Sequence, residues 1–124
     1  MIFPGVKNSR FALIGSGKVL CYFAKELIRL GFPKPIIITW FKEKHKRDEK
    51  LLENNINFES IFSLVRELEI EIFEVDNINC SSSIDILKSN NVNILFSISS
   101  RWIFSSNLIK LFDCPDASKT IHVI

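Results

Sequence analysis

The residues best suited to chemistry in this chain of 124 residues include a small-residue turn near its amino end, Gly15-Ser16-Gly17. The turn lies between an apolar run and a segment with helical periodicity, and small residues there let a phosphate approach the amino end of a helix. Two interpretations stay open. The turn is either a tight connection at the edge of a sheet, or the backbone N–H groups of Ser16 and Gly17 bind an anionic substrate.

The turn departs from two known phosphate-binding patterns. A dinucleotide fingerprint would have a third glycine where Leu20 stands, and an acidic residue after the second strand, where Lys42–Lys50 is mainly basic. A P-loop is excluded because its lysine is followed by serine or threonine, whereas Val19 follows Lys18.

The segment Lys42–Lys50 contains five basic residues, three acidic residues and His45. Such a run cannot enter a hydrophobic core, so we interpret Phe41–Asn57 as a long solvated excursion. The alternative is that its positive field guides an anionic substrate, such as a phosphate, a nucleotide or the tRNA backbone. As a lone histidine among lysines, His45 is expected to be exposed rather than a metal ligand, and we expect no metal site in the chain.

Hydrophobic periodicity predicts the elements that position these groups. The predicted strands are Arg10–Gly15, Ile36–Trp40, Ile70–Val75, Val92–Ser97 and Thr120–Ile124. The predicted helices run from Lys18 to a stop at Gly31, over roughly Glu59–Glu69, from the run of serines at 81–83, through Ile84, Ile86 and Leu87, to a stop at Asn90 and Asn91, and over Asn107–Phe112. We expect the hydroxyls of Ser81, Ser82 and Ser83 to cap the third helix. The strand Ile70–Val75 should lie at a sheet edge with one face in water.

The regular alternation of strands and helices predicts the fold class. We expect a single α/β domain over residues 1–124, with a Rossmann-like, open, mostly parallel sheet of about five strands and helices on both of its faces. In such sheets a ligand binds outside the carboxyl ends of the strands.

The composition excludes several classes of protein. A hydrophobic content of 47% favours an ordered core over a disordered chain. A net charge of +2 is too small to favour nucleic acid or an anionic membrane as the main partner. The three widely spaced cysteines predict neither a disulfide framework nor a zinc site, and no apolar stretch approaches a membrane span, so we expect a cytoplasmic protein.

Several segments in the same order carry a resemblance to a known family. They are the turn FALIGSG, the helix end LIRLGF, the strand IEIFEV, the segment SISSRWIF and the triplet Thr120-Ile121-His122. From Arg10 onward the chain resembles the amino-terminal half of the formyltransferases that use 10-formyltetrahydrofolate. This family of one-carbon metabolism includes methionyl-tRNA formyltransferase, glycinamide ribonucleotide transformylase and the nucleotide-sugar N-formyltransferases.

The resemblance implies a role for each matching residue. The loop after the fourth strand would hold the pterin of the formyl donor, 10-formyltetrahydrofolate, and it corresponds to Ser99, Ser100, Arg101, Trp102 and Ile103. His122 matches the catalytic histidine of the family motif Asn-x-His, while Thr120 stands in place of its asparagine. A threonine hydroxyl is a shorter donor, and loss of one well-placed oxyanion donor costs roughly 2.7 to 4 kcal/mol of transition-state stabilisation.

The family pattern continues beyond the point where this sequence ends, with a further loop, a catalytic aspartate and the acceptor-binding half. We therefore expect a domain truncated after the histidine strand that is weak or inactive alone. The acceptor amine stays open between a nucleotide-linked amino sugar and methionyl-tRNA. The alternative function is a non-catalytic module that binds folate or a nucleotide and associates, with itself or with a complementary chain, through the unfinished edge of its sheet.

Overall fold

The computed structural model describes residues 8–41, 44, 61–98, 100, 102–112 and 119–124. The elements in this part of the chain are β1 (Phe11–Gly15), α1 (Lys18–Arg29), β2 (Ile36–Thr39), α3 (Ile61–Leu68), β3 (Ile72–Glu74), α4 (Ser81–Ser89), β4 (Ile94–Ile98), α5 (Ser106–Leu111) and β5 (Thr120–Val123). Apart from Phe41 and Lys44, the excursion predicted over Phe41–Asn57, with His45, lies outside the described residues.

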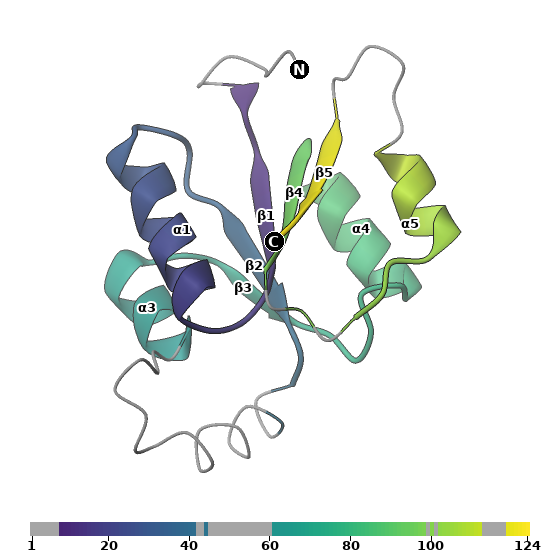
Figure 1. Ribbon diagram of the computed structural model, residues 1–124, viewed down its shortest axis with the longest axis horizontal. Helices are drawn as coiled ribbons and strands as arrows, with labels where there is room; N and C mark the ends of the chain where they lie inside the picture. The colour runs from purple at the N-terminus through teal and green to yellow at the C-terminus, as the bar shows by residue number, and fades with distance from the viewer. Residues whose placement is uncertain (1–7, 42–43, 45–60, 99, 101, 113–118) are drawn as a thin grey trace.

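The strands form a single parallel sheet in the order β3-β2-β1-β4-β5. Figure 1 shows α1 and α3 on one face of this sheet and α4 and α5 on the other. The predicted fold class, a Rossmann-like open sheet with helices on both faces, is confirmed, and every strand pair is parallel.

None of the described helices is both long enough and apolar enough to cross a membrane.

Each face of the sheet carries its own hydrophobic core. Leu13 of β1 and Ile37 of β2 pack on the side of α1 and α3, whereas Ile14 and Leu95 pack on the side of α4 and α5. Because side chains alternate between the two faces of a strand and both faces are covered, the central strands are apolar at nearly every position.

The predicted helix stops at Gly31 and Asn91 are confirmed, and both follow the same geometry. Gly31 has φ +88° and Asn91 has φ +54°, the left-handed conformation that ends many helices. After α1, the N–H groups of Gly31 and Phe32 donate to carbonyls of its last turn, and after α4 those of Asn91 and Val92 do the same.

Two local predictions were wrong. Because α4 begins at Ser81, the residue in the capping position is Cys80 rather than a serine. Cys80 makes no side-chain capping bond. The Ser83 hydroxyl instead donates to the carbonyl of Asn77 at 3.0 Å. β3 lies at the sheet edge as predicted, but Phe73 on its supposed wet face packs against the core beside α4.

Candidate functional site

The sheet order creates one position where the connections diverge. After β1 the chain passes to α1 on one face, and after β4 it passes to α5 on the other face (Figure 1). In open parallel sheets a ligand crevice forms outside the carboxyl ends of two neighbouring strands whose connections part in this way. The carboxyl ends of β1 and β4 are therefore the first place to look for a site.

The small-residue turn after β1 lies directly against the end of β4. Gly15 has φ +133°, and a Cβ atom at this position would lie 1.8 Å from the carbonyl oxygen of Ile98 and 3.2 Å from the nitrogen of Ser100. The N–H of Ser16 donates to the same Ile98 oxygen at 3.4 Å. Two predicted site segments, the turn and the loop after β4, are thus brought together, and only glycine fits at position 15.

Gly17 meets different surroundings from Gly15. It has φ +96° and precedes the first residue of α1, and no atom lies within 4 Å of the place where its Cβ would be. It offers no side-chain cap to the helix. The space beside the amino end of α1 is therefore open at this residue, as contact with a ligand would require.

The loop after β4 is described in part, since Ser99 and Arg101 lie outside the described residues. The Ser100 hydroxyl accepts a hydrogen bond from the N–H of Trp102 at 3.1 Å. The Trp102 ring meets Trp40 edge to face, with centroids 5.6 Å apart, and packs on the α4 and α5 side of the sheet. Ile103, by contrast, is 89% exposed.

Asn79, which the sequence analysis did not single out, holds this loop in place. Its Nδ2 donates to the carbonyl of Ile103 at 2.8 Å, and its Oδ1 accepts from the N–H of Ser105 at 2.7 Å. Asn79 is itself held by the side chain of Asn77, which accepts its N–H at 2.8 Å. The two asparagines in the segment Asn77-Ile78-Asn79 are typical of side chains that bond to nearby backbone, and this was the signal available in the sequence.

His122 and Thr120 lie on β5, next to β4. The parallel register places His122 beside Phe96, and the two rings stack with centroids 5.0 Å apart. His122 Nε2 and Thr120 Oγ1 are 3.1 Å apart, so the two predicted catalytic side chains share a hydrogen bond. Both residues are half-buried.

The sheet separates the predicted residues into two groups. Phe96 packs with α1 and α3, so its neighbour His122 belongs to that face, whereas Trp102 packs with α4 and α5. The carboxyl edge of the sheet is the place where a ligand could reach both groups. The contact with the buried Trp40 ring gives the Trp102 ring a packing role, whereas the Ile103 side chain is exposed.

Cys80 is the titratable group with a shifted pKa beside this loop. Partial burial favours the neutral thiol, but hydrogen bonds from the Ser83 side chain and from the backbone of Ser83, Ser82 and Asn77 outweigh it, so the pKa of Cys80 is lowered. The Cys80 Sγ and Ser83 Oγ atoms are 3.3 Å apart.

Among the residues that the structure describes, no three His, Cys, Asp or Glu side chains gather as metal ligands.

The chain matches no protein-family model and no curated protein.

Proposed function

We propose that this chain binds a reduced folate, 10-formyltetrahydrofolate, at the carboxyl ends of β1 and β4, as a domain of a formyltransferase. The observation that carries the proposal is the hydrogen-bonded pair His122 and Thr120 on β5, one strand beyond the point where the connections diverge. A histidine two residues after a polar side chain at this position is what the resemblance to the formyltransferases leads us to expect.

The proposed donor site combines backbone and apolar surface. Among the described residues of the loop after β4, Ile103 supplies an exposed apolar side chain, and Asn79 holds the carbonyl of Ile103 and the N–H of Ser105 in place. Rigid backbone can donate to and accept from the polar edge of a pterin without an entropy cost on binding. The open space beside Gly17 and the amino end of α1 would accept a negatively charged part of the ligand.

The proposed reaction transfers a formyl group to an amine. The amine nitrogen attacks the formyl carbon, the carbonyl oxygen becomes an oxyanion, and the bond from carbon to N10 of the folate then breaks. The proton that the amine loses ends on N10. His122 would donate to the oxyanion, and Thr120 would orient the imidazole through their shared hydrogen bond.

We expect binding to be easier to detect than transfer. The Thr120 hydroxyl lies 3.1 Å from His122 Nε2 and is hydrogen-bonded to the imidazole. It would therefore not supply a second hydrogen bond to the oxyanion. The acceptor is proposed to be a primary amine, with nucleotide-linked amino sugars and methionyl-tRNA as the two candidates.

Isothermal titration with 5-formyltetrahydrofolate, a stable isomer of the donor, tests the proposal. We expect saturable binding at one site, which a charged side chain in the loop, Ile103→Glu, weakens about tenfold or more, a loss of roughly 1.4 kcal/mol. His122→Ala should leave binding within about twofold and remove any amine-dependent formyl transfer. Absence of binding to the intact, folded chain would refute the proposal.

A second candidate function rests on the outer strand of the sheet. β5 lies at the sheet edge, Val123 is 77% exposed and Ile124 is 56% exposed, and neither a lysine nor a proline interrupts Thr120–Val123. Such an edge readily pairs with another strand. The alternative is a non-catalytic module that associates with a second copy of this chain through β5. A chain that sediments as a dimer and binds no folate would favour this second function.

A further inference from the structure

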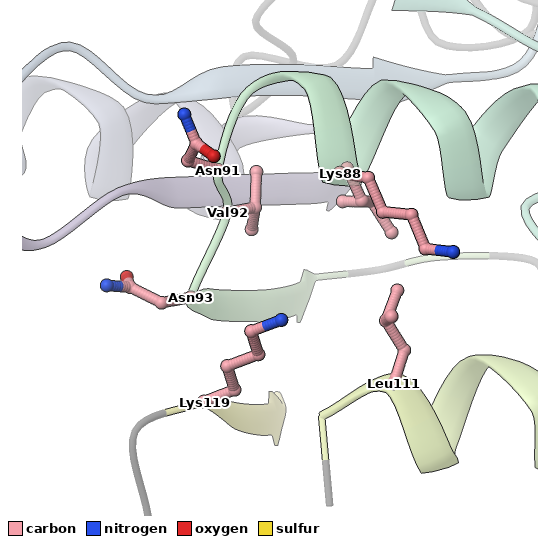
Figure 2. Close-up of a pocket in the computed structure, with 7 residues that line it drawn as sticks. Lys88, Asn91, Val92, Asn93, Leu111 and Lys119 are labelled. Carbon is pink, nitrogen blue, oxygen red and sulfur yellow. The ribbon is translucent and has the colours of Figure 1, made fainter. Parts of the chain in front are cut away.

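A cavity of about 370 Å³ lies at the opposite edge of the sheet from the proposed folate site. It is bounded by the end of α4, the residues that lead into β4, the end of α5 and the residue before β5 (Figure 2). Leu87, Val92 and Leu111 supply its apolar walls, and Lys88 and Lys119 supply its charge. A volume of this size is sufficient for a small organic ligand.

The two lysines give this cavity a positive charge. In Figure 2 the side chains of Lys88, from α4, and Lys119, from the start of β5, extend into the gap on either side of Leu111. Among the described residues no carboxylate lines the cavity, and neither lysine forms an ion pair there. Two ammonium groups near a shared, partly enclosed space attract a ligand with two negative charges.

The carbonyl groups at the carboxyl end of α4 are a possible source of negative charge beside the two lysines. Helix carbonyls at such an end carry partial negative charge and would repel an anion. Here the carbonyl of Ile86 accepts from the N–H of Asn90, that of Leu87 from Val92, and that of Lys88 from Asn91, at 3.0 to 3.1 Å. These three backbone oxygens are thus already hydrogen-bonded within the turn, and no described carboxylate pairs with the Lys88 ammonium group.

We propose that this cavity binds a small organic phosphate. The phosphate dianion would lie between Lys88 and Lys119, and the carbon part of the ligand would contact Leu87, Val92 and Leu111. Asn91 and Asn93 complete the lining of the cavity. The site is separate from the folate site, because it lies at the amino ends of β4 and β5 rather than at the carboxyl ends.

Titration with phenyl phosphate, inorganic phosphate and phenol tests the proposal. We expect saturable binding of phenyl phosphate, weaker binding of inorganic phosphate because it lacks the apolar contact, and no binding of phenol because it lacks the charge. Lys88→Gln and Lys119→Gln should each weaken phenyl phosphate binding about tenfold, since each removes a charge-assisted hydrogen bond.

Lys110→Gln is the matched control, because Lys110 is an exposed lysine of α5 that does not line the cavity. It should change the affinity by less than about twofold. Equal circular dichroism spectra would show that all three variants are folded. The proposal is overturned if phenyl phosphate does not bind the folded chain, or if the Lys88 and Lys119 variants bind it as tightly as the Lys110 variant does.

Discussion

The two edges of the sheet are built in opposite ways. At the carboxyl edge, the turn after β1 approaches the end of β4 so closely that a Cβ on Gly15 would lie 1.8 Å from a backbone oxygen. At the amino edge there are cavities of about 370 Å³ and 240 Å³; Lys88 and Lys119 line the first, and Arg10, Lys34 and Glu71 line the second. The carboxyl edge is closely packed where β1 meets β4, whereas the amino edge contains open volume, and two lysines line its larger cavity.

We expect this difference between close packing and open volume to give the two edges different kinds of ligand recognition. A ligand at the carboxyl edge would meet backbone held in fixed positions by Asn79 and by the carbonyl of Ile98. A ligand at the amino edge would meet the flexible side chains of Lys88 and Lys119. We expect the first arrangement to select ligands by shape and the second to select them by charge, so the two edges should respond differently to substitution.

The largest effect is expected at the closest approach, Gly15→Ala. The added methyl group would overlap the Ile98 carbonyl, and φ +133° is unfavourable for any side chain, so β1 and β4 would have to separate. We expect the free energy of unfolding to fall by more than about 3 kcal/mol in urea denaturation.

Gly17→Ala is the matched control for this substitution. It carries a similar backbone strain at φ +96° but meets no atom within 4 Å, so its cost should be about 1 to 2 kcal/mol. If the two variants were equally stable, contact with β4 would not be what restricts position 15.

A smaller effect is expected when the loop after β4 loses its support through Asn79→Ala. Two hydrogen bonds of about 0.5 to 1.5 kcal/mol each are removed, so unfolding should become easier by about 1 to 3 kcal/mol, and folate binding should weaken. Asn79→Asp keeps the acceptor for Ser105 and loses the donor to Ile103, so its free energy of unfolding should lie between those of the unsubstituted chain and Asn79→Ala. Phenyl phosphate binding at the amino edge should not change, and an equal loss at both edges would contradict independent sites.

The order and ends of the elements could be predicted from the sequence because their signals are local. The apolar run before Gly15 and the helical spacing after Lys18 predicted β1 and α1, and Gly31 and Asn91 stop their helices through their own backbone conformation. The resemblance to a formyltransferase, by contrast, stays a prediction, since it concerns what the site binds rather than how the chain folds.

The arrangement at the two edges could not be predicted, because it depends on pairing between distant segments. Only the register of β4 with β5 places His122 beside Phe96. The same pairing places Lys119 along the same cavity as Lys88, a relation that no spacing rule in the sequence predicts. The serine run failed as a predicted cap because Ser83 bonds to Asn77, a contact set by the loop before α4.

The smallest effect concerns Cys80, which reports on the carboxyl edge without any substitution. Of the two described cysteines, Cys80 is partly exposed with a lowered pKa and Cys21 is fully buried, so iodoacetamide should modify Cys80 before Cys21, as peptide mass spectrometry can measure. Because Asn79 joins this segment to the loop after β4, 5-formyltetrahydrofolate should slow the modification by a factor of about two to three. Phenyl phosphate should leave the rate unchanged. Protection of Cys80 by phenyl phosphate alone would place the organic phosphate at the carboxyl edge and remove the distinction between the two edges.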